Sequence, residues 1–287
     1  MIYKYIDRKT NKICEEKSVI GTPFLYKNPL GGLALKVAKQ RFVSRIAGWY
    51  LNKKRTTKYI KGFIKDNNID MEEYPEVEYK CFNEFFSRKI KEGRRIFSNN
   101  KKDFCSPCDS RLQVFKINEK EEFTIKKHKY TLESLLRDKK LANEYKNGYL
   151  MVFRLFVDDY HRYTFIDDGK VIKTRTINGK YHNVGPIAFE KHKIYPEAQR
   201  EYSVLKTENF GEIIQMEVGA MLVGKIVNHD IKKFKRGEEK GYFLYGGSTI
   251  IIIVKENVIT IDEDIMNNSM VPMETKVRQG EKVARAN

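Results

Sequence analysis

The sequence predicts an α+β fold, with a largely antiparallel β core and an N-terminal lobe of amphipathic helices. Residues 29–100 carry apolar side chains at helical spacing, whereas the remainder consists mostly of short apolar runs separated by turn residues. A chain of 287 residues can close around one main core and still carry a helical appendage. We therefore expect residues 1–100 to form an N-terminal segment with the helical lobe, and residues 101–287 to form a β-rich domain.

Two stretches predict the helical lobe. Between residues 35 and 50, a rotation of 100° per residue gathers an apolar arc that only Lys39 interrupts, with Lys36 and Arg45 at its edges. The arc contains Leu35, Ala38, Phe42, Val43, Ile46, Trp49 and Tyr50. A second helix is expected over residues 58–65, where apolar residues lie beside lysines. Such helices either pack on the main domain or lie in a bilayer interface, where lysine and arginine stems reach lipid phosphates.

Short strands are expected beyond residue 100. The candidate runs are 111–117, 150–155, 162–166, 170–176, 212–218, 221–227 and 249–254. The turn pairs Asp168-Gly169 and Asn178-Gly179 separate some of these runs, and such turns favour antiparallel neighbours.

The charge favours an anionic partner. Lys and Arg number 55 against 38 Asp and Glu, which gives a formal net charge of +17. Nucleic acid is disfavoured because the chain lacks an RNP-type pattern, and its positive charge is concentrated before residue 102 with the amphipathic helices. No run approaches 18 apolar residues, and Met1 to Ser18 lacks signal-peptide features. We therefore expect an intracellular chain that binds an anionic membrane surface peripherally and does not span the bilayer.

The cysteines predict neither disulfides nor a metal site. Cys14, Cys81, Cys105 and Cys108 are few and irregularly spaced, which is typical of reduced thiols. The CxxC at residues 105–108 has no second CxxC or HxxxH to complete a structural zinc site. We expect no bound metal.

The stretch Gly246-Gly247-Ser248-Thr249 stands directly before the apolar run Ile250 to Val254. Two glycines followed by β-branched residues indicate a turn and a buried strand. A sharper interpretation makes Ser248 a nucleophile aimed at its own backbone. His161, in the segment DDYHRYTF, is likewise either a structural or a catalytic histidine. These segments alone leave both interpretations open.

Seven segments together resemble the phosphatidylserine decarboxylases, enzymes that make a pyruvoyl cofactor from an internal serine. Each segment alone is weak evidence, but all seven occur in that family's order, from about Asn28 to the C-terminus. They are FVSRIAGWYLN (42–52), FNEFFSRKIKEGRR (82–95), SPCDSRL (106–112), YTLESLL (130–136), DYHRY (159–163), VGAMLVGKI (218–226) and KGYFLYGGST (240–249).

The resemblance implies that the chain cuts itself between Gly247 and Ser248. The Ser248 hydroxyl would attack the Gly247 carbonyl, and elimination from the resulting ester would leave dehydroalanine. Hydrolysis of that residue would release ammonia and leave a pyruvoyl group at position 248. The products would be a large subunit (1–247) and a small subunit (248–287). Gly247 lacks a Cβ, so its peptide can adopt the strained geometry that the attack requires.

The resemblance also assigns the groups that activate Ser248. The family has an Asp in an SPxD segment and a His in the YHR region, which correspond here to Asp109 and His161. A carboxylate that orients an imidazole, which in turn takes a proton from a hydroxyl, is the arrangement that activates a serine. We expect Asp109 to orient His161.

The mature reaction implied by the resemblance converts phosphatidylserine to phosphatidylethanolamine. The substrate amine would form a Schiff base with the pyruvoyl carbonyl at position 248, which accepts the electron pair released as CO2 leaves. His161 is the candidate proton donor, because imidazole titrates near neutral pH. The enzyme would lie peripherally on the cytoplasmic side of the cell membrane. The sequence does not decide whether it forms a homodimer.

The chain departs from the family pattern at two places. Family members often have a second histidine three positions after the first, where this chain has Thr164. Either His161 carries the charge relay, or another histidine reaches the site, with His182 in KYHNVG the best candidate. The family usually has small residues around the Asp, whereas here the segment is SPCDS, with Asp109 itself in place.

Two other functions remain open at this point. A pyruvoyl decarboxylase of a soluble amino acid would share the self-cleavage but would not need a membrane-seeking lobe. A non-enzymatic, basic membrane-binding protein would need the lobe and the charge but not Ser248.

Overall fold

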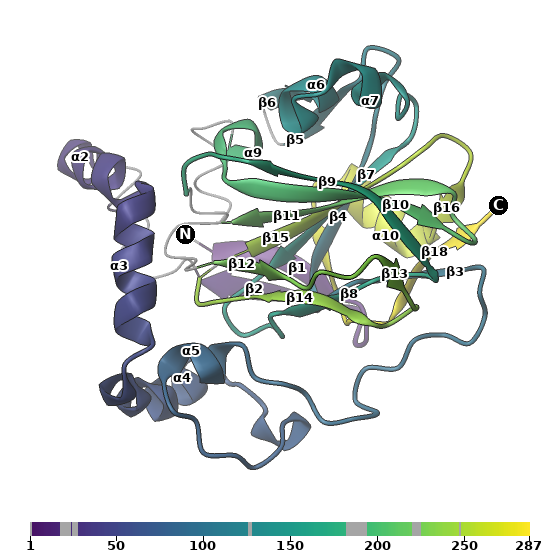
Figure 1. The fold of residues 1–287 in the computed structure, drawn as a ribbon. Helices are drawn as coiled ribbons and strands as arrows, with labels where there is room; N and C mark the ends of the chain where they lie inside the picture. The colour runs from purple at the N-terminus through teal and green to yellow at the C-terminus, as the bar shows by residue number, and fades with distance from the viewer. Residues whose placement is uncertain are drawn as a thin grey trace.

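The chain folds around one large β-sheet, with its N-terminal helices gathered at one side (Figure 1). The computed structural model describes residues 2–17, 24, 28–125, 128–181, 194–219, 225–246 and 248–287. In spatial order the ten strands are β13 (Lys233–Phe234), β9 (Gly169–Ile177), β10 (Arg200–Thr207), β11 (Glu212–Gly219), β15 (Ser248–Val254), β7 (Tyr149–Leu155), β4 (Ser110–Lys116), β17 (Glu274–Val277), β1 (Ile2–Asp7) and β2 (Lys12–Lys17).

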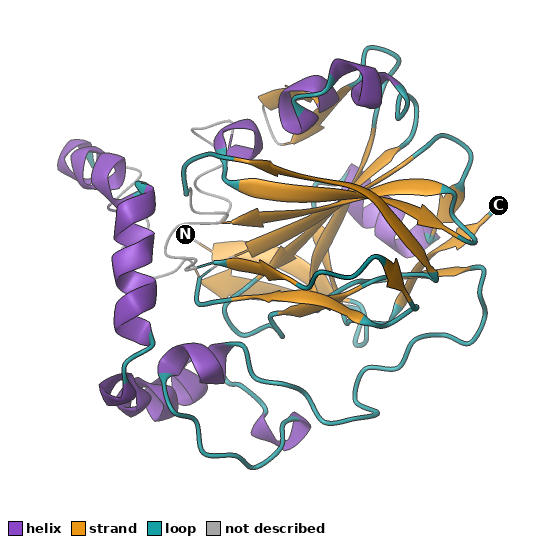
Figure 2. Cartoon of the chain, in the orientation of Figure 1, coloured by secondary structure: helices purple, strands orange, loops and turns teal. Residues whose placement is uncertain are grey.

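Smaller sheets and helices complete the fold (Figure 2). Two three-stranded sheets consist of β12 (Ile226–Asn228), β14 (Glu239–Phe243) and β8 (Arg162–Thr164), and of β16 (Ile259–Ile261), β18 (Lys282–Ala286) and β3 (Asp103–Cys105). Strands β5 (Glu122–Ile125) and β6 (His128–Thr131) pair antiparallel as a two-stranded sheet. The helices of the main domain are α6 (Leu132–Leu136), α7 (Lys139–Asn143), α9 (Ile194–Glu197) and α10 (Glu263–Met270).

The strand pairings confirm the α+β class and the largely antiparallel core. Every pairing between named strands is antiparallel except that of β1 with β17. Six of the predicted strands are present with ends within two residues of the expected ones, namely β4, β7, β8, β9, β11 and β15. The seventh, 221–227, begins outside the described residues, and β12 starts at Ile226. Residues 2–17 join the edge of the large sheet as a hairpin.

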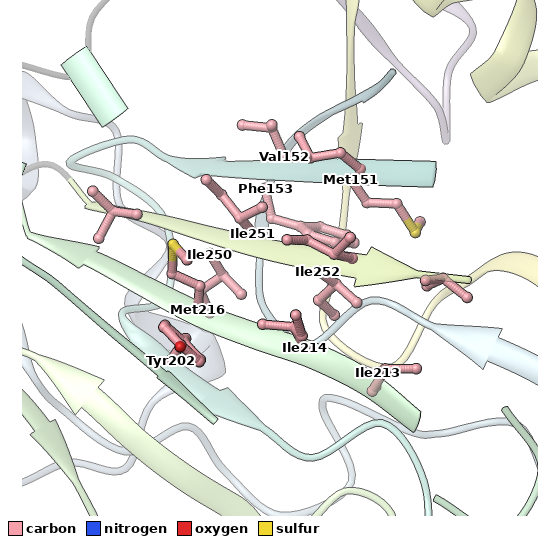
Figure 3. Packing of buried hydrophobic residues seen from close by; sticks show 14 of the residues in the cluster. Met151, Val152, Phe153, Tyr202, Ile213, Ile214, Met216, Ile250, Ile251 and Ile252 are labelled. Atoms are coloured by element: carbon pink, nitrogen blue, oxygen red, sulfur yellow. The ribbon is translucent and has the colours of Figure 1, made fainter. Parts of the chain in front are cut away.

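Strand β15 lies at the centre of the core. It pairs with β11 on one side and with β7 on the other, and all seven of its residues are fully buried. Figure 3 shows Ile250, Ile251 and Ile252 among apolar side chains of both neighbouring strands. Both faces of the strand are covered, which is why the run is apolar throughout rather than alternating. Burial of each isoleucine contributes about 2 kcal/mol.

The helical lobe contains α2 (Pro29–Ala38), α3 (Arg41–Leu51), η1 (Lys54–Tyr59), α4 (Ile60–Asp66), η2 (Met71–Glu73) and α5 (Phe82–Phe86). It has an apolar cluster of its own, centred on the rings of α5, and Tyr160 of the main domain packs into that cluster. The backbone N–H of Phe82 donates to Thr56 Oγ1 at 3.1 Å, which joins α5 to η1. Because Tyr160 packs into this cluster, the lobe is attached to the segment that contains His161.

The prediction of one continuous helix over residues 35–50 is wrong. Gln40 has extended backbone angles (φ −76°, ψ 142°), so that α2 ends before it and α3 begins after it. The carbonyl of Lys39 accepts a hydrogen bond from the backbone N–H of Tyr181 at 3.0 Å, a tertiary contact that periodicity does not encode. The predicted arc is split as well, because Leu35 is buried whereas Phe42 and Trp49 are exposed.

Candidate active site

Ser248 is the first residue of β15 and lies opposite Gly219 of β11 and Leu155 of β7. Its side chain is 0% exposed, and its Oγ has no hydrogen-bond partner among the described residues. Buried hydroxyls nearly always have a partner. The Oγ of Ser248, at the start of a central strand, is thus not engaged by any described residue.

The residues before Ser248 form a sharp bend. Gly246 is buried and has a φ of +132°, a conformation that favours glycine because a Cβ would be strained there. Gly247, the other half of the expected cleavage site, lies outside the described residues. The backbone N–H of Tyr245 donates to Asn83 Oδ1 of α5 at 3.3 Å. Helix α5 thus holds the chain just before the bend.

His161 is buried and can act as a proton acceptor through one ring nitrogen. Its Nδ1 lies 2.8 Å from the carbonyl oxygen of Asp159. A carbonyl can only accept, so Nδ1 carries the proton and Nε2 has a free lone pair in the neutral ring. Nε2 is buried and has no partner in the described part of the chain. Burial, and next the charge of Arg88, lower the pKa of His161 to about 3, so the ring is neutral at pH 7.

Helix α5 lies between His161 and the bend before Ser248. The ring of Phe86 is 4.1 Å from the ring of His161 and 5.1 Å from that of Tyr245, measured between centroids. The backbone N–H of Phe243 also donates to the His161 carbonyl at 2.9 Å. One aromatic residue therefore contacts both His161 and the segment that leads to Ser248.

Asp109 has a different set of partners from the one expected. It accepts two hydrogen bonds from Arg95, from Nε at 2.8 Å and from Nη2 at 2.5 Å, and one from the backbone N–H of Gln279 at 2.8 Å. Arg95 also contacts Glu73 at 2.9 Å. No hydrogen bond joins Asp109 to His161 among the described contacts: the Asp159 carbonyl is the partner of His161 Nδ1, and Arg95 and the Gln279 N–H are the partners of the carboxylate.

The comparisons with known proteins agree on one family. A family model described as phosphatidylserine decarboxylase matches residues 82–285, which include Asp109, His161 and Ser248. The phosphatidylserine decarboxylase proenzyme 2 of Clostridium acetobutylicum is 52% identical over 92% of this chain and 91% of its own length. The chain belongs to the phosphatidylserine decarboxylase family.

Further members of the family are similar over almost the whole chain. The phosphatidylserine decarboxylase proenzyme of Fusobacterium nucleatum is 41% identical over 97% of this chain and 96% of its own length. The phosphatidylserine decarboxylase proenzyme of Ruminiclostridium cellulolyticum is 41% identical over 90% of this chain and 89% of its own length. Family membership makes this protein a carboxy-lyase. The named relatives are described as proenzymes, that is, as precursors.

The family's second histidine position is structural in this chain. Thr164 donates from its backbone N–H, at 3.0 Å, and from its hydroxyl, at 3.3 Å, to the carbonyl of Pro107. It therefore fastens β8 to the turn that carries Asp109. His182, the reserve candidate, lies outside the described residues.

Cys105 and Cys108 are both buried and form no disulfide, and Arg236 Nη2 donates to Cys105 Sγ at 3.0 Å.

Sequence reasoning missed three residues that surround His161. The carbonyl of Asp159 sets the tautomer, Phe86 packs on the ring, and Arg88 lowers the pKa of the ring. Backbone carbonyls leave no signal in a sequence. Phe86 and Arg88 stand in the segment FNEFFSRKIKEGRR, which the sequence singles out, but nothing in that segment indicates that it lies beside residue 161.

Proposed function

We propose that this protein decarboxylates phosphatidylserine to phosphatidylethanolamine with a pyruvoyl group that it makes from its own Ser248. The observation that carries the proposal is the buried Oγ of Ser248, which has no partner among the described residues and stands two positions after the positive-φ Gly246, in a chain of this family. A serine without such a role could lie on the surface with its hydroxyl in water. The apolar anchor of β15 supports the same conclusion, because it would keep residue 248 in place after a cut.

Self-processing needs only groups of the chain and one water molecule. The Oγ of Ser248 would add to the Gly247 carbonyl carbon, and the peptide C–N bond would break to leave an ester and a free amine. Loss of the α-proton and of the Gly247 carboxylate would give dehydroalanine. Water would then replace the amine, which leaves as ammonia, so that a pyruvoyl group ends the fragment 248–287. Gly247 lacks a Cβ, so its peptide can adopt the geometry that the first step requires.

His161 is the proposed base of the first step. Its Nε2 carries a lone pair at neutral pH, because the Nδ1 proton is held by the Asp159 carbonyl. Asp109 is proposed as a positioning residue that acts through Gln279. The Gln279 side chain donates to the carbonyls of Pro107 and Arg162, at 3.1 and 3.2 Å, and so links the Asp109 turn to the residue after His161.

The chain supplies a suitable environment for the mature reaction. When formed, the pyruvoyl carbonyl supplies an electrophile for the substrate amine and takes up electrons as CO2 leaves. Ser248 is fully buried and lies between two paired strands, which limits the access of bulk water to position 248. His161 would hold or return a proton there through Nε2, since no described group competes for that atom.

The helical lobe is proposed to dock on an anionic bilayer, on the cytoplasmic side of the cell membrane. Phe42, Ile46 and Trp49 of α3 are 56%, 59% and 59% exposed, and with Arg45 they line a hollow of about 350 Å³. Lys53 Nζ lies 4.2 Å from the centre of the Trp49 ring. Exposed aromatics with cations at their rim suit the headgroup region. Within the described residues, no helix is long and apolar enough to cross a bilayer.

A liposome experiment separates this function from decarboxylation of a soluble amino acid. The purified protein should release CO2 from phosphatidylserine in mixed vesicles and should not decarboxylate free serine. The double variant Lys36→Gln/Arg45→Gln should bind anionic vesicles more weakly, with normal self-cleavage. The matched control Lys206→Gln/Lys233→Gln removes two exposed charges from strands remote from α3 and should bind normally (Figure 1). Equal binding by both double variants would contradict the docking proposal.

The same preparation tests the role of Ser248. The variant Ser248→Ala should fold, stay uncut and lack activity, because it has neither the nucleophile nor the pyruvoyl precursor. Ser248→Cys should cut slowly. Release of CO2 from phosphatidylserine by an uncut Ser248→Ala chain would refute the proposed function.

A further inference from the structure

Arg88 is a buried cation with unfilled hydrogen-bonding capacity. The residue is 4% exposed, and its Nη1 donates to the carbonyl of Phe85 at 3.3 Å. Nε and Nη2 are buried and have no partner in good hydrogen-bond geometry among the described residues, although the guanidinium interacts with the Tyr74 hydroxyl and opposes the rise in its pKa that burial causes. An uncompensated buried charge is costly. A site with such a cation is therefore suited to an anion that arrives from outside.

Aromatic rings surround the guanidinium of Arg88. The guanidinium carbon lies 4.1 Å from the centre of the Tyr74 ring and 4.7 Å from that of Phe85. Cation–π contacts stabilise the positive charge, whereas an oxyanion accepts hydrogen bonds from the N–H groups. Tyr79 packs edge-on against Phe85 at 5.4 Å, and its hydroxyl is a second buried donor without a described partner. Two unfilled donors thus flank one phenylalanine.

Arg88 belongs to a segment that runs alongside His161. Phe86 packs on the His161 ring, and Arg162 Nε donates to the Ser87 carbonyl at 2.8 Å. The backbone N–H of Ile90 lies 3.5 Å from the Tyr160 hydroxyl. Residues on both sides of Arg88 therefore contact residues on both sides of His161. The positive charge of Arg88 accordingly acts on His161, whose pKa it helps to lower.

The surface next to Arg88 offers space for a small polar group. A cavity of about 470 Å³ is lined by Tyr74 and Tyr79, by the cations Lys91 and Arg94, and by the carboxylates Glu72 and Glu76. This volume lies in the range of ordinary ligand pockets. Tyr74 belongs to both sites, because it lines the cavity and its ring also packs on the guanidinium of Arg88.

We propose that Arg88 binds the phosphodiester of the substrate headgroup, with the Tyr79 hydroxyl as a second donor. This inference rests on the proposed function. Arginine recognises phosphate oxygens through paired N–H donors, and a phosphodiester keeps its charge throughout the reaction. The carboxylate is a poorer partner. An ion pair would stabilise the carboxylate in the bound substrate and lose that stabilisation as CO2 forms, which would slow the reaction.

Kinetics of the processed enzyme test the proposal. Arg88→Gln should cut itself normally and show a KM for phosphatidylserine in mixed micelles that is roughly 10- to 100-fold higher, with a smaller change in kcat. Arg88→Lys keeps the charge and should give an intermediate KM. The control Lys89→Gln removes the same charge from the adjacent exposed residue and should leave KM within about twofold. An unchanged KM in Arg88→Gln, or equal effects at residues 88 and 89, would overturn the proposal.

Soluble competitors identify the group that Arg88 binds. Glycerol 3-phosphate should inhibit the parent enzyme competitively. Its inhibition should be weaker in Arg88→Lys and weakest in Arg88→Gln. N-acetylserine carries a carboxylate and no phosphate. Its inhibition constant should therefore be the same for the parent enzyme and for the Arg88 variants. If N-acetylserine were the competitor that depends on Arg88, the phosphodiester assignment would be wrong. If the parent chain neither cut itself nor released CO2, the proposed function would fail, which is a different result from an unchanged KM.

Should Arg88→Gln not fold, Arg88→Lys and Tyr79→Phe provide the same test. Tyr79→Phe removes one unpaired hydroxyl and keeps the ring contact with Phe85. It should raise KM roughly 3- to 10-fold without a change in self-cleavage. Normal KM values in both variants would overturn the proposal.

Discussion

The neutral state of His161 has a measurable effect on stability. Burial of the ring, and next the charge of Arg88, lower its pKa to about 3, whereas in the unfolded chain the pKa is about 6.5. As the pH falls below 6.5, the unfolded chain takes up a proton that the folded chain does not. The contribution of His161 to the free energy of unfolding is therefore complete above pH 6.5 and is lost as the pH falls toward 3.

The size of the effect follows from the same shift. Each pH unit between the two pKa values changes the free energy of unfolding by at most about 1.4 kcal/mol. Between pH 6.5 and 4.5, His161 should thus remove about 2–3 kcal/mol. Carboxylates titrate in the same interval, so the effect has to be measured as a difference between two chains that share them.

Urea unfolding of the Ser248→Ala chain provides the assay, because that chain should not cut itself during the measurement. Its free energy of unfolding is compared at pH 7 and pH 4.5 with that of Ser248→Ala/His161→Gln. The histidine chain should lose about 2–3 kcal/mol more than the glutamine chain. Equal losses would refute the neutral, buried His161. In the Ser248 chain, the rate of self-cleavage should likewise show no inflection near pH 6.5.

Three further predictions concern other parts of the fold. Ile252→Ala, in the centre of β15, should lower the free energy of unfolding of the uncut chain by about 2–5 kcal/mol. The control Ile172→Ala, at a half-exposed position, should change it by less than about 0.5 kcal/mol. Equal urea midpoints for the two variants would contradict the central position of β15. Asp109→Asn should lower the free energy of unfolding by about 3 kcal/mol, because it leaves Arg95 partly unpaired. Asp109→Asn/Arg95→Met should lower it by less than the sum of the two single changes. A stable Asp109→Asn chain that does not cut itself would instead place Asp109 in the chemistry. Trp49→Ser should weaken sedimentation with anionic vesicles at both low and high salt, because it removes apolar area rather than charge; unchanged sedimentation would exclude α3 from the contact.

The sequence predicted those features that short segments encode. The run Ile250 to Val254 indicates a buried strand on its own, since its length and β-branching leave few alternatives. The glycines before Ser248 indicate a bend, and Gly246 adopts a φ that only glycine favours. Strand ends were predicted to within two residues where turn residues bound the strand.

Features that depend on distant contacts were not predictable in this way. The break at Gln40 coincides with a hydrogen bond from Tyr181, more than a hundred residues away in the chain. The partner of Asp109 is Arg95, because the loop that carries Arg95 returns to the turn before β4. The orientation of His161 depends on a backbone carbonyl, which every residue possesses. Tertiary packing therefore decided the contacts of the residues that the sequence singled out.

The mass of the purified protein tests the central claim most directly. The account predicts two fragments, 1–247 and 248–287, that stay associated in native buffer without a disulfide. The smaller fragment should resist Edman degradation and should be lighter, by the difference between serine and a pyruvoyl group, than a fragment that begins with serine. A single intact chain that releases CO2 from phosphatidylserine, or a small fragment that begins with an unmodified serine in the active enzyme, would contradict the account.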